Sequence, residues 1–331
     1  MKPSELEKVL AVAIENRHPL LIVGPPGIGK SDIVAQCCAV AGVELLVFHP
    51  VISDPTDFKG LPFARDGEAE FLPFGDLKAL ITASRPTVAF LDDLGQAPAS
   101  VQAAAMQLLL ARRIADHRVS DRVTFLAATN RVGDRAGVQG VLEPVKSRFV
   151  SIINLAADVD DWLRWAAGAG MPEVLRSFIR FRPSLLCAFA PTRSLTNSPT
   201  PRTVAFAGTI LNSGYGEEIF EEMIAGACGE AFLAEFRGFL RARKDLPDID
   251  LILARPKTAR VPKKAEHLYA LVGAVSCRAE PANFSRILTY AGRIPAEFAA
   301  LLIKDCLIYR PELADDPALR EWSVANDRLV A

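Results

Sequence analysis

Residues 24–31 have the types and the spacing of a loop that binds phosphate groups. They follow the pattern G-x-x-x-x-G-K-[ST], between an apolar run over 20–23 and a helical pattern over 32–40. Such glycines let backbone N–H groups converge on phosphate oxygens, and the N-terminus of the next helix adds partial positive charge. Lys30 can then reach the outer phosphates, and the Ser31 hydroxyl can bind Mg²⁺. The residues expected to line this site are Gly24, Pro25, Pro26, Gly27, Ile28, Gly29, Lys30, Ser31 and Asp32.

An acidic pair follows a second apolar run, over residues 87–91. The run is bounded by Pro86, and Asp92 and Asp93 come directly after it. This pattern indicates a buried parallel strand that ends at a site. Asp92 is then placed to hold Mg²⁺, directly or through water, and Asp93 to orient and polarise an attacking water. A surface turn with two acidic residues is the alternative, and the phosphate loop upstream favours the site.

Three further residues suit the same chemistry, although each signal is weak by itself. Asn130 follows a third apolar strand, over 123–128, where its amide could hydrogen-bond a water or the outer phosphate. Arg148 stands just before another apolar stretch, and Arg202 lies in the first turn of a helix opened by Pro201. Taken singly, each is better explained by a structural role.

The order of these features along the chain is that of the AAA+ ATPases, and the chain resembles the MoxR branch of that superfamily. The resemblance also covers residues 54–60, 94–102 and 133–138, and it extends from about residue 4 to about residue 240. It implies that residues 24–31 are a Walker A motif and that Asp92 with Asp93 forms a Walker B motif.

The resemblance also implies roles for the three weaker candidates and for partners. Asn130 would be the first sensor, Arg148 the arginine finger offered to a neighbouring subunit, and Arg202 the second sensor; Arg131 and Arg135 are the reserve candidates for the finger. The implied cofactors are ATP and Mg²⁺. The implied partners are further copies of the chain in a ring, expected to be a hexamer, a client protein, and a protein with a von Willebrand factor A domain.

One departure from the family pattern concerns Asp93, where the family usually has Glu. Asp is shorter by one methylene, about 1.5 Å of reach, and a misplacement of about 1 Å can lower a rate about 100-fold. The prediction of ATP binding therefore does not depend on Asp93, whereas the prediction of turnover does.

Length and composition exclude several classes of protein. The chain has 331 residues, half of them apolar, and a formal net charge of −1, so nothing indicates a protein that coats nucleic acid. No apolar run reaches the roughly 18 residues of a membrane helix, and the charged N-terminus does not read as a signal peptide. We expect a cytoplasmic protein whose six cysteines are reduced and, lacking a C-x-x-C pair, bind no zinc. Cys37 and Cys38 are expected to be packed thiols.

Residues 1–154 alternate short apolar runs with amphipathic stretches, which predicts an α/β nucleotide-binding core. Five strands, expected to form a parallel sheet, are predicted near 20–24, 45–49, 87–92, 122–128 and 149–153. The Asp-Gly pair at 66–67, between apolar flanks, predicts a hairpin over 61–72. The resemblance places this hairpin in an insertion that faces the ring pore, and an ordinary surface hairpin is the alternative.

Strand patterns nearly vanish after residue 154. Residues 155–245 are predicted to be helical, with helices over 158–167, 172–180, 201–212 and 229–243, and the resemblance implies that they form the lid of the AAA+ fold. Residues 246–331 are predicted to be a helical C-terminal extension that begins with a loop-like junction over 246–262 and continues with helices near 265–278, 282–292, 295–308 and 317–325. The stretch 255–264 is basic. A solvated linker is its default interpretation, and contact with an acidic partner is the alternative.

Together these patterns predict an AAA+ ATPase that assembles in a ring, hydrolyses MgATP and remodels a client protein. A nucleotide-gated assembly scaffold with weak hydrolysis is one alternative, and Asp93 favours it. A nucleic-acid motor is another, although the net charge and the lack of an aromatic-basic cluster argue against it. A monomeric phosphoryl transferase would leave Arg148 and Arg202 without a joint role.

Overall fold

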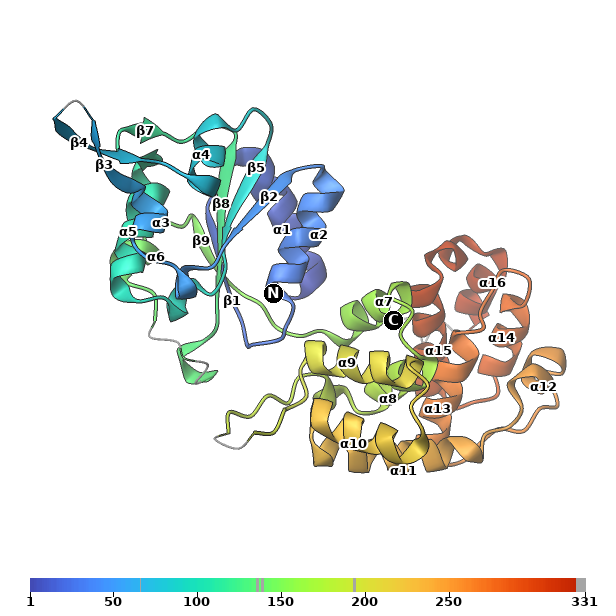
Figure 1. The fold of residues 1–331 in the computed structure, drawn as a ribbon. Coiled ribbons are helices and arrows are strands. Elements are labelled where there is room, and N and C mark those ends of the chain that lie inside the picture. The colour runs from blue at the N-terminus through green and yellow to red at the C-terminus, as the bar shows by residue number, and fades with distance from the viewer. Residues whose placement is uncertain (66, 135–136, 138–139, 193–194, 326–331) are drawn as a thin grey trace. The chain divides into compact units, whose positions relative to one another are not determined.

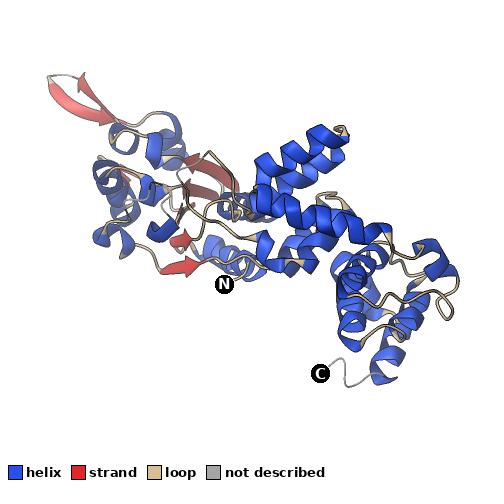
Figure 2. Ribbon diagram, turned by 90° about the horizontal axis from the view of Figure 1, so that it is seen from below, coloured by secondary structure: helices blue, strands red, loops and turns tan. Residues whose placement is uncertain are grey.

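The structure, a computed structural model, describes residues 1–65, 67–134, 137, 140–192 and 195–325. The chain divides into two compact units, one built mainly of residues 1–157 and the other mainly of residues 158–331. Every strand of the described residues lies in the first unit, and the second is helical (Figure 2). None of the helices in the described part of the chain combines the length and the apolar character needed to span a membrane.

A five-stranded parallel sheet forms the centre of the first unit, in the order β2-β5-β8-β1-β9 (Figure 1). Positions in β5 and β8 are buried throughout, which explains why these strands read as continuous apolar runs. The predicted parallel sheet is confirmed, and the ends of the strands differ from the predicted ones by at most two residues. The strands are β1 (Leu20–Val23), β2 (Glu44–Phe48), β5 (Thr87–Leu91), β8 (Val123–Thr129) and β9 (Ser151–Asn154).

Helices cover both faces of the sheet. Because side chains alternate along a strand, Leu20 and Ile22 join the core under α1 (Pro3–Asn16) and α2 (Lys30–Ala41). Leu21 points the other way, into the core beneath the helices that follow β2. Those helices are α3 (Thr56–Lys59), α4 (Gly75–Thr82), α5 (Ala99–Ala111) and α6 (Glu143–Lys146), with short 3-10 turns at Pro50–Ile52, Leu94–Gln96 and Val132–Asp134.

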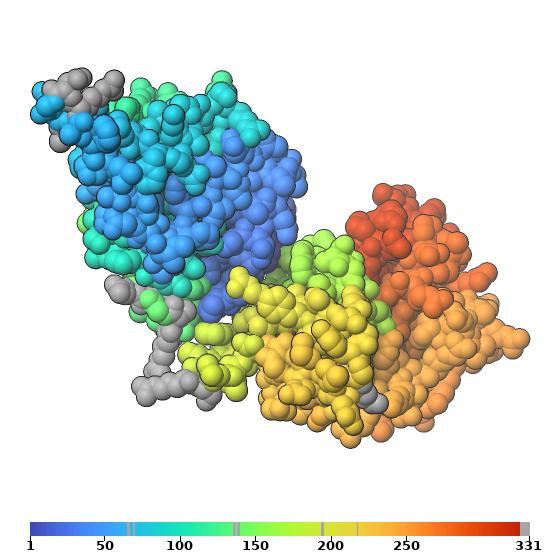
Figure 3. Space-filling model, viewed as in Figure 1, coloured from blue at the N-terminus to red at the C-terminus, as the bar shows by residue number. Residues whose placement is uncertain are grey.

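The hairpin predicted over 61–72 is confirmed. Strands β3 (Leu61–Arg65) and β4 (Glu68–Leu72) pair antiparallel between α3 and α4, and the hairpin extends from the edge of the α/β unit (Figure 3). Phe63 and Phe71 on it are exposed. Its position relative to a ring pore stays a prediction, and Asp66 in its turn lies outside the described residues. A second, shorter hairpin joins β6 (Arg113–Ile114) and β7 (His117–Arg118).

The second unit contains helices from both the predicted lid and the predicted extension. The predicted helix over 201–212 has the predicted bounds, because Thr200 and Thr203 form a capping box and Pro201 stands at the first helical position. The helices are α7 (Val159–Gly168), α8 (Glu173–Phe181), α9 (Pro201–Asn212), α10 (Glu217–Cys228), α11 (Glu230–Lys244), α12 (Ile249–Ala254), α13 (Ala265–Ser276), α14 (Phe284–Ala291), α15 (Ala296–Tyr309) and α16 (Pro317–Ala325), with 3-10 turns at Pro183–Leu186 and Pro311–Asp315.

Two elements of this unit correct the sequence analysis. The loop-like junction predicted over 246–262 is wrong in part, because residues 249–254 form α12. Asp248 caps α12 by accepting a hydrogen bond from the backbone N–H of Asp250, and Ile252 anchors it in the core. Helix α10 was not predicted, since glycines lie just outside both of its ends and one lies within it, and these weaken its helical pattern.

The cysteines behave as packed thiols, as expected for Cys37 and Cys38. None of the six cysteines, all of which lie in the described part of the chain, is in a disulfide bond. Burial raises the pKa of Cys37 and of Cys38 to about 11, with a smaller contribution from Glu7 at Cys37 and from Cys37 at Cys38. Both thiols are therefore protonated at neutral pH, which does not suit a reactive or metal-binding thiolate.

Candidate active site

The predicted phosphate loop runs from the end of β1 to the start of α2. Gly27 and Gly29 have φ angles of 72° and 99°, in the left-handed region that glycine adopts without strain. Gly24 is held by its N–H, which donates to the Thr129 carbonyl at 3.2 Å. The Ile33 N–H then donates to the Gly29 carbonyl at 2.9 Å and opens α2. The loop thus leads into a helix N-terminus, as an anion site requires.

Lys30 is buried and its ammonium group is held by three acceptors. Nζ donates to the carbonyls of Gly24 and Pro25 at 3.0 and 3.1 Å and to Asn130 Oδ1 at 2.6 Å. Asn130 lies within reach because β1 pairs with β8 and Val23 is in register with Thr129, the residue before it. Sheet register therefore brings together two candidates that are a hundred positions apart in the sequence.

Ser31 and Asp92 also lie together. Ser31 Oγ donates to Asp92 Oδ2 at 2.6 Å, and Asp92 Oδ1 accepts the N–H of Asp93 at 3.0 Å. Asp92 directly follows β5, so a hydroxyl and a carboxylate meet beside the phosphate loop. Hydroxyl and carboxylate oxygens are the ligands that Mg²⁺ prefers, and the ion commonly keeps several waters. The donor set therefore fits the Mg²⁺ site predicted from the sequence.

Asp93 connects to the same group of residues. The Asn130 Nδ2 amide donates to Asp93 Oδ1 at 3.5 Å, a long contact. The Asp93 backbone has a φ of 55°, and the 3-10 turn 94–96 begins immediately after it. The structure thus joins Lys30, Asn130 and Asp93 in one chain of contacts, which the sequence analysis did not anticipate. The signal that could have indicated it is the position of the three residues at the carboxyl edge of one parallel sheet.

The arginine candidates have different surroundings. Arg148 is half-buried after α6 and donates from Nη1 to Ser147 Oγ at 3.0 Å, while its buried Nε has no hydrogen-bond partner among the described residues. Arg131 is exposed, and its Nη2 donates to the Leu155 carbonyl at 3.3 Å. A Cβ added to Gly24 would stand 3.2 Å from that same carbonyl oxygen, so Arg131 lies beside its own phosphate loop. Arg135 lies outside the described residues.

Arg202 belongs to the second unit. It is exposed in the first turn of α9, directly after Pro201. Contacts within the first unit join Lys30 to Asn130, Asn130 to Asp93, and Ser31 to Asp92, and Arg148 lies in the same unit with its side chain on Ser147. The second-sensor role of Arg202 stays a prediction.

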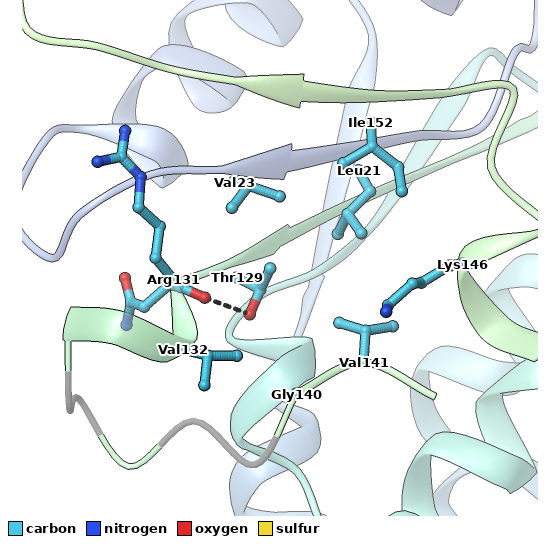
Figure 4. Close-up of a pocket in the computed structure, with 10 residues that line it drawn as sticks. Leu21, Val23, Thr129, Arg131, Val132, Gly140, Val141, Lys146 and Ile152 are labelled. Carbon is cyan, nitrogen blue, oxygen red and sulfur yellow. Dashed lines mark hydrogen bonds between the residues drawn. The ribbon is translucent and has the colours of Figure 1, made fainter. Parts of the chain in front are cut away.

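A pocket of about 250 Å³ lies against the face of the sheet that carries Leu21 and Val23 (Figure 4). Leu21, Val23 and Ile152 form its sheet wall, and Val141 and Lys146 face them. Asn130 also lines it, whereas none of residues 24–32 does. Gln102, which the sequence analysis gave no site role, holds the adjoining backbone: its amide donates to the Gly140 carbonyl at 2.9 Å and accepts from the Leu142 N–H at 3.0 Å.

Comparison with protein families shows which kind of domain the first unit contains. Residues 19–149 match the family model of the AAA domain, dynein-related subfamily. The first unit has an AAA+ P-loop fold. This AAA+ domain contains Lys30, Ser31, Asp92, Asp93, Asn130 and Arg148, and only Arg202 of the principal candidates lies outside the matched segment.

Solved structures are similar to the chain at low identity. The RuvB Holliday junction branch migration motor of Thermotoga maritima is 17% identical with a TM-score of 0.41, covering 82% of this chain and 81% of that one. NtrX from Brucella abortus is 11% identical with a TM-score of 0.35, covering 73% and 51%. Scores this low do not support a transfer of function. No curated protein matches the chain significantly.

Proposed function

We propose that the chain binds MgATP in its AAA+ domain and hydrolyses it. The observation that carries the proposal is the arrangement at the carboxyl edge of the sheet, where Lys30 contacts Asn130, Asn130 contacts Asp93, and Ser31 contacts Asp92. Asp92 and Asp93 follow β5 and Asn130 follows β8, whereas Lys30 and Ser31 begin α2, after the loop that leaves the neighbouring strand β1. Their types are those that transfer of a phosphoryl group to water requires.

Each residue would have a distinct task. Lys30 and the N–H groups of residues 24–31 stabilise negative charge on the phosphate oxygens. Ser31 and Asp92 supply oxygen ligands for Mg²⁺, which when bound neutralises phosphate charge. Asp93 accepts a proton from the attacking water, and Asn130 holds the Asp93 carboxylate in position.

The proposal extends to the assembly of the protein. We infer a MoxR-like ring of identical subunits, most simply a hexamer, in which Arg148 reaches the neighbour's site and Arg202 completes its own. Remodelling of a client protein, with a von Willebrand factor A domain protein as partner, belongs to the same inference. This inference is supported by the order of motifs along the chain. The family match does not bear on it, since that match is to the dynein-related subfamily and covers residues 19–149 alone.

A nucleotide-gated scaffold is the second candidate function. Asp93 favours it, because the shorter carboxylate reaches Asn130 only at 3.5 Å. Such a protein would bind MgATP and assemble but release phosphate slowly. Measurement of phosphate release by the assembled protein separates the two functions.

Titration calorimetry of MgATP on the parent and on Lys30→Ala tests the binding site. We expect binding by the parent and none by the variant, because the substitution removes the ammonium group that faces the phosphates. Lys78→Ala, at an exposed lysine of α4, is the matched control and should bind like the parent. Unchanged affinity in a folded Lys30→Ala protein, as judged by circular dichroism, would sink the site assignment.

A further inference from the structure

The basic stretch 255–264 is an ordered loop and not a solvated linker. It connects α12 to α13. Tyr290 of α14 is hydrogen-bonded to it, with the Tyr290 OH donating to the Arg260 carbonyl at 2.8 Å. The Arg293 guanidinium donates to the carbonyls of Pro256 at 2.6 Å and of Ala259 at 2.8 Å. These bonds satisfy backbone carbonyls that a free linker would present to water.

The side chains of the loop divide by type. Ala259 is 4% exposed, Pro262 is buried, and Val261 packs against the apolar core of α12–α16. The cations lie on the outside, and all five are exposed: Arg255, Lys257, Arg260, Lys263 and Lys264. The stretch contains no acidic residue. Because hydrogen bonds hold the backbone of the loop, its five positive charges stay on one short segment of the surface.

Four of these five cations form no ion pair with another described residue, whereas other basic residues of the same unit do. Arg182, Arg237 and Arg278 each pair with a carboxylate. Lys264 is the fifth cation, and its ammonium nitrogen lies 4.0 Å from a carboxylate oxygen of Glu266. Like charges this close in the sequence repel one another, most strongly at low ionic strength, where salt screens them least. A negatively charged partner would relieve that repulsion and gain charge-assisted hydrogen bonds.

We propose that loop 255–264 is a docking site for an acidic, carboxylate-rich segment of a protein partner. A short acidic segment fits because the five cations lie within ten residues, and the flanking acids Asp250 and Glu266 already pair with Arg278 and Lys264. Nucleic acid fits less well. The loop contains no aromatic residue, and Tyr290, which contacts it, is buried with its hydroxyl bonded, so it cannot stack on a base.

The site is separate from the nucleotide chemistry proposed above. The loop belongs to the second unit, and none of its residues is among the candidate active-site residues. Substitutions in the loop should therefore leave binding and hydrolysis of MgATP by the isolated protein unchanged. This separation lets the docking proposal fail or succeed independently of the proposed function.

Fluorescence anisotropy of a labelled short poly-glutamate peptide, added to the full-length protein at low ionic strength, tests the proposal. The informative variant carries Lys257→Glu with Arg260→Glu. Its matched control carries Lys244→Glu with Arg241→Glu, which changes the same residue types at exposed positions of α11. We expect the loop variant to bind the peptide at least about tenfold more weakly than the parent, and the control to bind within a fewfold of it.

A labelled DNA duplex of the same length is measured in parallel. Tighter binding of the duplex than of the peptide, lost in the loop variant, would overturn the assignment of a protein partner in favour of nucleic acid. Equal peptide affinity in the loop variant and the control, or no binding by the parent, would overturn the site. Unchanged thermal melting of both variants shows that their folds are intact.

Discussion

At Asp93, the conformation of the backbone matters together with the carboxylate. The φ angle of 55° lies in the left-handed region, where Asp and Asn occur several-fold more often than other non-glycine residues. This conformation begins the 3-10 turn after β5 and leaves the carboxylate 3.5 Å from the Asn130 amide. A glutamate at this position would gain reach but would adopt a backbone conformation that it disfavours.

Asp93→Asn should lower turnover by about 10²–10⁴ while MgATP affinity stays within a fewfold, because it removes the proton acceptor and keeps the side-chain size. Asp93→Glu should raise turnover and lower the melting temperature. Steady-state phosphate release and thermal melting measure both effects. Asp116→Asn, at an exposed residue of the β6–β7 turn, is the control and should behave like the parent. Parent-like turnover of both Asp93 variants would show that Asp93 is not the catalytic carboxylate.

Among the elements, α8 and α13 pack unusually closely. A Cβ added to Gly273 of α13 would overlap Ser177 Oγ and stand 2.5 Å from Ser177 Cβ of α8. Elsewhere in a helix interior, Ala is favoured over Gly because Gly loses more backbone entropy on folding. The absence of a side chain at Gly273 therefore lets α8 and α13 approach each other closely.

Gly273→Ala should destabilise the protein by about 1–3 kcal/mol, because α8 and α13 must separate. Gly238→Ala is the matched control on α11, where an added Cβ meets nothing within 4 Å, and it should stabilise by about 0.5–1 kcal/mol. Urea unfolding of both variants gives the comparison. Equal effects of the two substitutions, in size and sign, would contradict the close packing.

A buried ion pair joins α8 to α15 in the same core. Arg180 donates from Nε to Asp305 at 3.2 Å and from Nη2 to the same carboxylate, and from Nη1 to Asp160 of α7 at 2.6 Å. Lys304 pairs with the other oxygen of Asp160. Arg180 and Asp305 are 9% and 1% exposed. Burial raises the pKa of Asp305 to about 6, against the opposing effect of Arg180.

The raised pKa of Asp305 gives the stability a definite pH dependence. In an unfolded chain the pKa of Asp is about 3.9. Between about pH 4 and pH 6 the folded Asp305 therefore keeps a proton that the unfolded chain has released. The contribution of Asp305 to the free energy of unfolding therefore falls as pH rises through this window and is constant above it. Relative to Asp305→Asn, the parent should lose stability from about pH 4 to about pH 6 in urea unfolding.

Asp315→Asn, at an exposed aspartate after α15, is the control for this measurement, and relative to it the parent should show no such trend. The same pH dependence in the parent and in Asp305→Asn would show that Asp305 does not titrate in this range.

For the molecule as a whole, the division into an α/β unit and a helical unit separates the candidate residues. Lys30, Asp92, Asp93 and Asn130 form contacts within the first unit, whereas Arg202 lies in the second. Arg148 is in the first unit, and its guanidinium donates a hydrogen bond to Ser147 Oγ, outside the phosphate loop. The arrangement is consistent with the proposal that Arg148 serves a neighbouring copy.

Arg148→Ala should bind MgATP like the parent and hydrolyse it about 10³–10⁵-fold more slowly, the range known for arginine fingers. Mixing Arg148→Ala with Lys30→Ala subunits should restore part of the activity, because each supplies what the other lacks at mixed interfaces. Specific activity of the parent should rise with protein concentration. Arg122→Ala, at an exposed arginine of the same unit, is the control. A constant specific activity, without rescue on mixing, would indicate a self-contained monomeric site.

The sequence by itself determined the local elements of this protein. The phosphate loop, five strands, the 61–72 hairpin and the helix over 201–212 follow from glycine spacing, apolar periodicity and capping residues, which act over a few positions. It did not reveal α10 or α12, where glycines and prolines weaken the helical period even though core packing stabilises the helix.

Only the tertiary structure decided which distant residues meet. The contact of Lys30 with Asn130 depends on the pairing of β1 with β8, and that of Arg180 with Asp305 depends on helix packing across 125 positions. The basic loop became an ordered surface through bonds from Tyr290 and Arg293, which lie about thirty positions away. A local sequence pattern predicts the conformation of a segment but not which distant segments it contacts, because those contacts depend on how the whole core packs.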